Sequence, residues 1–209
     1  MPNDYSRYNY VGINMNIKKG LPERYNGFAA EFLLNALGEK FIPILGKKSN
    51  AQKLLQSSIN SKNCFCVEED GNLLGVLAFQ TIEGSFINPS LKILFSIYGF
   101  FLGTMKAIGL SMLQHKTKAR ELYVEAVAVS ESARGKGIGT KLFDSVFEFA
   151  TNNGYGFITL QVIDINPRAK DLYEKIGFTV IKRSSVWPMN RIISWPFKEV
   201  FLMKKMLKS

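Results

Sequence analysis

The chain has 209 residues, which is long enough for one domain (1–209) with a substantial apolar core. Apolar residues make up 46% and charged residues 21%, and this balance excludes a mostly disordered chain. The formal net charge of +10 indicates an affinity for anions, but the basic residues are scattered, so we expect no nucleic-acid partner.

The first half of the chain predicts two helices followed by two strands. Residues 1–20 show no period and are expected to form an extended lead-in. They lack the basic start and apolar run of a signal peptide, so a cytoplasmic location is expected. Asp70-Gly71 indicates a hairpin turn between the strands. The predicted elements are a helix from Pro22 in which Phe28, Phe32, Leu33, Ala36 and Leu37 recur at helical spacing, a helix over 50–59, and strands over 64–68 and 73–79.

The two cysteines, Cys64 and Cys66, are separated by a single residue in a predicted strand. They lie too close along one strand for an ordinary disulfide, and His115 is the only histidine. We therefore expect two buried, reduced thiols and no metal site.

Residues 86–117 are unusually apolar and are expected to form a helical insertion. The run over 93–105 carries no charge, although Lys92 and Lys106 interrupt the longer apolar stretch. Because the segment lies between strands of one predicted sheet, a membrane-spanning helix ranks third among its interpretations. The insertion is expected to pack beside the acceptor end of a cofactor cleft, as a wall for the substrate or as the interface of a homo-oligomer. A peripheral membrane contact is the remaining, less favoured alternative.

The second half of the chain predicts a strand-helix-strand crossover, followed by one more helix and two more strands. The strand that begins it is almost wholly apolar, which is typical of the centre of a sheet. The elements are strands over 122–129, 157–163, 178–183 and 199–206, with helices over 137–152 and 167–177.

The junction between the strand at 122–129 and the next helix carries a basic, glycine-rich turn, residues 130–140. Alternating glycines allow a ligand to approach the backbone amides, and a helix start adds partial positive charge. The spacing fits neither the P-loop nor the Rossmann pattern. Residue type and position therefore favour a pyrophosphate site, with a solvated basic loop as the alternative.

Two segments resemble signatures of the GNAT N-acetyltransferase superfamily. Residues 134–139 match its R/Q-x-x-G-x-G/A pattern, and residues 166–178 match N-x-x-A-x-x-L-Y-x-x-x-G-F. The resemblance is close over 121–183 and implies a mixed, mostly antiparallel α/β sheet flanked by helices, with the apolar insertion before the central strand. It also implies acetyl-coenzyme A as the cofactor.

The resemblance assigns roles to individual residues. The backbone of Val127, Ala128 and Val129 would hold the pantetheine arm and the thioester carbonyl, and Tyr173 would protonate the leaving thiolate. The remaining cofactor-binding residues it implies are Arg134, Gly135, Lys136, Gly137, Ile138, Gly139, Thr140 and Asn166. Asn166 is also a good helix cap, and Tyr173 could be an ordinary half-buried tyrosine.

The general base is less well defined by the sequence. Gln161 stands where some family members carry a glutamate, and an amide cannot accept the proton. Glu125 is the substitute, because it is expected to share a strand face with Val127 and Val129; an edge salt bridge is the alternative. His115 is expected on the surface.

The expected function is acetyl transfer to a primary amine of a small molecule or protein, by direct attack in a ternary complex. The high basic charge argues mildly against polycationic acceptors. Alternatives are an acetyl-CoA-binding regulatory module without catalysis and a membrane-docked acyltransferase.

Overall fold

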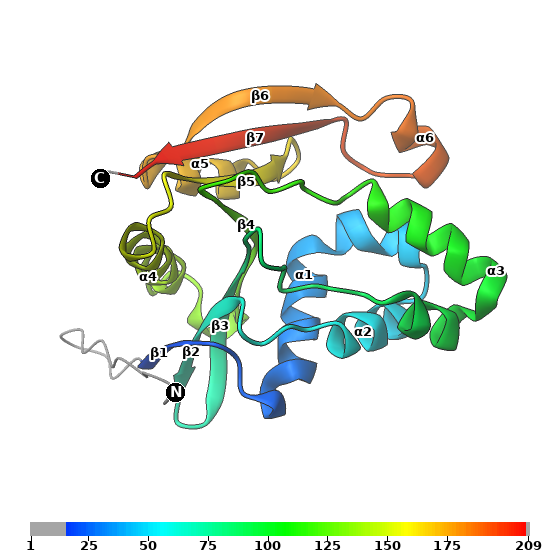
Figure 1. The fold of residues 1–209 in the computed structure, drawn as a ribbon, viewed down its shortest axis with the longest axis horizontal. Coiled ribbons are helices and arrows are strands. Elements are labelled where there is room, and N and C mark those ends of the chain that lie inside the picture. The colour runs from blue at the N-terminus through cyan, green and yellow to red at the C-terminus, as the bar shows by residue number, and fades with distance from the viewer. Residues whose placement is uncertain (1–15, 208–209) are drawn as a thin grey trace.

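The computed structural model describes residues 16–207, in which every strand joins one mixed sheet (Figure 1). The strand order is β1-β2-β3-β4-β5-β7-β6. β4 and β5 pair in parallel and the other neighbours pair antiparallel, so the sheet is mostly antiparallel, as the resemblance implies. The strands are β1 (Asn16–Lys19), β2 (Cys64–Glu69), β3 (Asn72–Gln80), β4 (Glu121–Val129), β5 (Phe157–Ile163), β6 (Thr179–Ser185) and β7 (Glu199–Met206).

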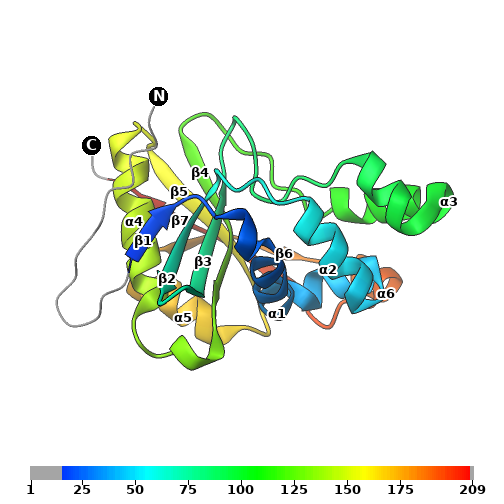
Figure 2. The same ribbon diagram turned by 90° about the horizontal axis from the view of Figure 1, so that it is seen from below.

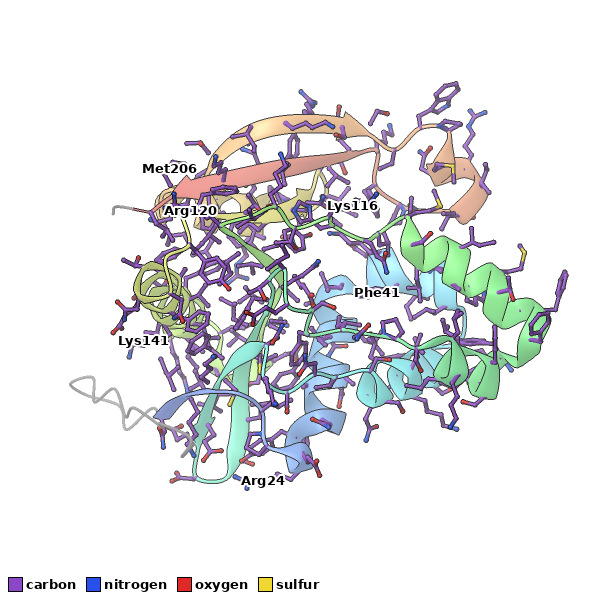
Figure 3. The ribbon with its side chains drawn as sticks, viewed as in Figure 1. Arg24, Phe41, Lys116, Arg120, Lys141 and Met206 are labelled. Carbon is purple, nitrogen blue, oxygen red and sulfur yellow. The ribbon has the colours of Figure 1, made fainter. Side chains whose placement is uncertain are left out.

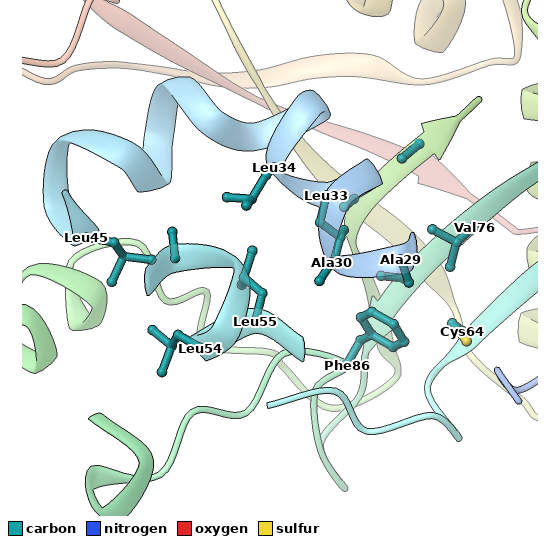
Figure 4. Close-up of a cluster of buried hydrophobic side chains, with 14 of the residues drawn as sticks. Ala29, Ala30, Leu33, Leu34, Leu45, Leu54, Leu55, Cys64, Val76 and Phe86 are labelled. Carbon is teal, nitrogen blue, oxygen red and sulfur yellow. The ribbon is translucent and has the colours of Figure 1, made fainter. Parts of the chain in front are cut away.

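Helices cover both faces of the sheet and bury two separate apolar clusters (Figures 1 and 2). On one face α1 packs over Val76 and Ala126, and α2 and α3 pack against α1; this first cluster is shown in Figure 4. On the other face α4 packs over Leu77 and Val124, with α5 beside it. The helices are α1 (Asn26–Leu45), α2 (Lys48–Ser57), α3 (Leu91–Ser111), α4 (Ile138–Asn152), α5 (Pro167–Lys175) and α6 (Met189–Ile193), with short 3-10 turns at Glu23–Tyr25 and Glu131–Ala133.

The predicted strand-helix-strand crossover is confirmed as β4, α4 and β5. The two predicted helices and the hairpin of the first half also form. The apolar positions predicted for α1 are confirmed in part: Leu33 is buried and Phe32 and Leu37 pack against the first cluster, whereas Phe28 is 57% exposed. Ala36 is exposed as well. The apolar residues of α1 are spread around most of its circumference, so their spacing does not determine which side of the helix faces the sheet.

Two elements were not predicted. β1 lies within the expected lead-in and adds an edge strand to β2, whereas residues 1–15 lie outside the described part of the chain. α6 is a short helix between β6 and β7. Cys64 and Cys66 are buried free thiols, as predicted, and burial raises the pKa of both.

The insertion forms α3, which bends sharply at Gly99. The backbone of Gly99 has φ 75° and ψ 171°, a conformation outside the helical region, so two helical halves meet at this residue. By length and composition alone, α3 is the one helix of the described chain that qualifies as a candidate membrane span. Figure 1 shows it at the end of the molecule opposite α4.

Candidate active site

The central feature of the site is the divergence of β4 from β5. The two strands pair in parallel only from Glu121 to Val124, opposite Phe157 to Leu160. Beyond this point β4 continues to Val129 paired with β3 alone, and β5 continues paired with β7. The backbone of residues 125–129 therefore presents one edge to the gap between the strands. Alternate amides of a strand point to opposite sides, and the amide of Ser130 donates to Leu74 beside β3 at 2.8 Å, so the amide of Ala128 also faces β3. Of the amides predicted to hold the thioester arm, those of Val127 and Val129 therefore lie on the open edge.

The glycine-rich turn follows β4 directly and leads into α4. Gly135 and Gly137 have φ values of +81° and +77°, which residues with a Cβ adopt only with strain. The space around both is open, since a Cβ built there would meet nothing within 4 Å. Gly137 caps the helix without any side-chain hydrogen bond. In the described chain no acceptor is found for the amides of Ile138, Gly139 and Thr140, since the first bond of the helix is from Lys141 to Gly137. These donors suit a phosphate.

The open strand edge and the glycine turn border the same cleft, which has a volume of about 1020 Å³. Such a volume lies at the upper end of the usual range for ligand sites, about 300–1,000 Å³. Of the predicted cofactor-binding residues, Lys136 alone is not among the described residues that line the cleft, and it is exposed. The residues that line it as predicted are Val127, Ala128, Val129, Arg134, Gly135, Gly137, Ile138, Gly139, Thr140 and Asn166.

Tyr173 lies on α5 and borders the cleft next to the end of β5. Its ring packs edge-to-face on Phe143 and Phe178, at centroid distances of 5.7 Å and 6.2 Å. Burial raises the pKa of its phenol to about 12. The group therefore stays protonated at physiological pH, which is the state that a proton donor to a thiolate requires.

Asn166 serves as the cap of α5 and also borders the cleft. Its side chain accepts a hydrogen bond from the amide of Ala169 at 3.2 Å, and Pro167 follows at the first helical position. The capping interpretation is thus confirmed. The residue positions the helix that carries Tyr173, whatever contact it makes with a ligand.

Glu125 occupies a β-bulge, and this changes the geometry expected for it. Val124 pairs with Phe79 and Ala126 with Ala78, so Glu125 is the extra residue of β4. Its carboxylate accepts hydrogen bonds from the backbone amides of Phe86 and Ile87, each at 3.2 Å. Phe86 packs in the first apolar cluster with Ala126, whereas Val127 and Val129 pack in the second. The prediction of a face shared with the two valines was therefore wrong, because the bulge breaks the alternation.

Glu125 is one of the residues that line the cleft, and it is half-buried. Burial raises its pKa to about 7, although the amides of Ile87 and Phe86 favour the ionised form. No cation pairs with it among the described residues, so the alternative of an edge salt bridge was wrong. A carboxylate that titrates near neutrality beside the open strand edge has the properties of a general base.

His115 is half-buried rather than freely exposed on the surface as predicted: its side chain is 13% exposed. Its ring stacks on Tyr123 at 4.1 Å, and Nε2 lies 2.8 Å from the carboxylate of Glu121. Burial opposes the ionisation of Glu121, but hydrogen bonds from Thr159, the Lys118 amide and His115 outweigh it and hold the pKa below its usual value. The buried carboxylate draws the histidine inward. This pair closes the end of the insertion onto the sheet, outside the cleft.

The opposite wall of the cleft comes from α1, and sequence reasoning missed its contribution. Its polar lining residues are Glu31, Asn35, Glu39 and Lys40. Burial lowers the pKa of Lys40 to about 8, and no carboxylate of the described chain pairs with it. The signal was present as polar residues at helical spacing beside the buried side of the helix. By contrast, no described residue of the insertion 86–117 lines the cleft, so its predicted role as a substrate wall was wrong: α1 fills that place.

Comparison with known proteins agrees with this geometry. Thialysine N-epsilon-acetyltransferase of Bos taurus is 36% identical over 80 residues, which are 38% of this chain and 47% of the relative. Streptothricin acetyltransferase of Streptomyces lavendulae is 31% identical over 70 residues, 34% of this chain and 37% of the relative. The matches thus span less than half the length of these relatives.

The solved structure of an N-acetyltransferase from Staphylococcus aureus Mu50 has the same fold. It superposes with a TM-score of 0.64 at 17% identity, covering 90% of this chain and 98% of that one. Residues 31–178 match the acetyltransferase (GNAT) family, and this range contains the divergent strands, the glycine turn and Tyr173. The chain belongs to the acetyltransferase (GNAT) family.

Proposed function

We propose that this protein transfers an acetyl group from acetyl-CoA to a primary amine by direct attack within a ternary complex. The observation that carries the proposal is the single cleft bordered by the open edge of β4, the amides at the start of α4 and the phenol of Tyr173. Backbone donors suit the pantetheine arm and the pyrophosphate, and Arg134 adds a positive charge. Acetyl-CoA, when bound, supplies the acetyl group as a reactive thioester.

Three groups of this chain would share the chemistry. The free amides of Val127 and Val129 on the open edge are placed to stabilise negative charge on a thioester carbonyl oxygen in the transition state. Glu125, with a pKa of about 7, accepts the proton that the attacking ammonium must lose, directly or through water. Tyr173 donates its proton to the departing thiolate.

A cationic primary amine is the acceptor class that the cleft favours. Glu31 and Glu39 bring carboxylates to the α1 wall of a protein whose net charge is +10. Local acidity of this kind attracts an ammonium group despite the overall charge. The names of the two relatives support the same class, since one specifies the N-epsilon amine of thialysine and the other streptothricin. Both small molecules and a protein lysine satisfy these requirements.

The direct test is thiol release from acetyl-CoA with a panel of amines. We expect thiol release that depends on the amine, and a faster rate with diamines and lysine analogues than with neutral amines of the same size. The amount of acetylated product, identified by mass spectrometry, must equal the amount of thiol released. Tight binding of acetyl-CoA with no transfer to any amine would contradict catalysis.

A binding module without catalysis is the second candidate, and one observation favours it. Both oxygens of Glu125 already accept backbone amides, which is what a purely structural carboxylate would do. The two candidates differ in the pH dependence of turnover. If Glu125 is the general base, turnover rises through about pH 7; if Glu125 is only structural, turnover shows no such rise.

A further inference from the structure

The outer side of α3 is the most apolar exposed surface of the described chain. Phe100 and Phe101 are 75% and 76% exposed, and they follow directly on the bend at Gly99. We call the following exposed residues the α3 apolar face: Leu91, Phe100, Phe101, Leu102, Met105, Ile108 and Met112. Soluble monomers seldom leave so many large apolar side chains together in water, so this face requires a partner.

The opposite side of α3 is held firmly by the protein. Leu94 is buried, and Ile97 and Leu110 pack against the first apolar cluster. A Cβ on Gly109 would lie 2.7 Å from Cγ2 of Ile44, so glycine is needed for the close approach of α3 to α1. Gly109 is thus explained by packing of α3 on α1, which leaves the α3 apolar face turned outward.

The bend at Gly99 argues against a spanning helix. It divides α3 into halves over 91–98 and 100–111. At 1.5 Å per residue these halves are roughly 12 and 18 Å long, whereas the hydrocarbon core of a bilayer is about 30 Å thick. Neither half can cross a membrane, but both can lie in its interface.

The surroundings of the α3 apolar face are basic throughout. Figures 1 and 2 place α2, α3 and α6 at the same end of the molecule. These three helices contain lysines and an arginine but no aspartate or glutamate. Lys92 and Lys106 lie on α3 itself, and Figure 3 shows Lys116 on the segment that leaves it. α6 and the turn before it add Ile192 and Trp187, which are 72% and 70% exposed.

We propose that the end formed by α2, α3 and α6 docks on the surface of an anionic membrane. The α3 apolar face enters the boundary between headgroups and acyl chains, and the surrounding lysines contact anionic headgroups. The charge distinguishes this occupant from a second copy of the chain. Two copies meeting through this end would bring together surfaces that carry the same positive charge, which is unfavourable.

Vesicle flotation tests the proposal. With the full chain, we expect flotation with vesicles of phosphatidylcholine mixed with phosphatidylserine, and much weaker flotation with phosphatidylcholine alone. F100S/F101S should reduce binding at least 10-fold, because it removes the two most exposed side chains of the face. Lys92→Glu with Lys106→Glu should reduce binding on the mixed vesicles and make it less sensitive to added salt.

The controls separate this surface from general stickiness and from the active site. Phe28→Ser changes an aromatic residue that is 57% exposed on α1 and should leave flotation unchanged. Because the α3 apolar face lies outside the cleft, F100S/F101S should keep acetyl-CoA binding and turnover with a soluble amine. Equal flotation of wild type and F100S/F101S would overturn the proposal. So would a dimer in light scattering that becomes a monomer in this variant, since the face would then be a subunit contact.

Discussion

The two faces of the sheet carry different parts of the site and do so with different kinds of chemistry. On the α4 side the ligand meets backbone: the open edge of β4 and the amides at the start of α4. On the α1 side it meets side chains, namely Glu31, Glu39 and Lys40. Backbone donors depend on chain geometry and therefore on glycine spacing, which short sequence motifs capture. Side-chain contacts depend only on which residues a helix turns toward the cleft, and short sequence motifs do not capture that.

Gly137 offers the largest test of the backbone side. Gly137→Val places a Cβ at φ +77° where the turn must hold the pyrophosphate, so we expect acetyl-CoA affinity to fall by about 100-fold or more. Calorimetric titration and the thermal shift caused by acetyl-CoA measure the loss.

Gly154→Val is the matched control for that variant. Gly154 follows the other end of α4 with φ +74° and also has nothing within 4 Å, so the backbone strain is similar. It should lower stability by a similar amount while leaving acetyl-CoA affinity unchanged. If both variants lost the same affinity, strain in α4 rather than the turn itself would account for binding.

Tyr173→Phe is expected to lower turnover by about 100-fold while acetyl-CoA affinity stays the same, because proton donation acts only in the transition state. The ring remains to pack on Phe143 and Phe178, so folding should be preserved. Turnover and affinity should be measured on one preparation. Tyr155→Phe, at the far end of α4, serves as the control, and normal turnover in Tyr173→Phe would remove the phenol from the mechanism.

Much of the α4 side could be predicted from sequence, and less of the α1 side. β4, α4, β5 and β7 begin and end within about one residue of their predicted bounds, because apolar period and turn residues agree there. The bulge at Glu125 could not be predicted, since it results from pairing with β3 and from the loop at Phe86. The polar wall of α1 was missed because the apolar residues of that helix do not define one side.

Glu125 and Glu121 lie on the same strand, and their pKa values are shifted in opposite directions, which allows a pH test. Burial raises the pKa of Glu125 from 4.5 to about 7, so the folded state holds its proton more tightly than the unfolded state does. Its contribution to stability is therefore greatest below pH 4.5 and declines as the pH rises to about 7. The shift corresponds to about 3 kcal/mol. As a base, Glu125 is active only above its pKa, so turnover should rise through about pH 7.

Glu125→Gln should lower turnover by about 10-fold at pH 8 and flatten both the rate and the stability profiles between pH 5 and 7. Glu121→Gln is the control: its pKa is lowered, so its stabilisation is lost only as the pH falls below its usual value, and it faces no cleft. That variant should be less stable yet keep the pH-rate profile. A profile unchanged in Glu125→Gln would leave Glu125 as an anchor of the loop at Phe86 and Ile87.

The smallest expected effects belong to the α1 carboxylates, and they decide whether this side selects the acceptor. Glu31 and Glu39 are exposed at the cleft, where one ion pair is worth up to about 1 kcal/mol, or a factor of about 5. Glu31→Gln and Glu39→Gln should each raise KM for a cationic amine by up to that factor, more at low salt, with KM for acetyl-CoA unchanged. Glu148→Gln removes the same charge from the outer side of α4 and should alter neither value. If KM for a neutral amine rose as much as KM for a diamine, the change would reflect the shape of the α1 wall rather than its charge, and the preference for cationic acceptors would have to come from elsewhere in the cleft.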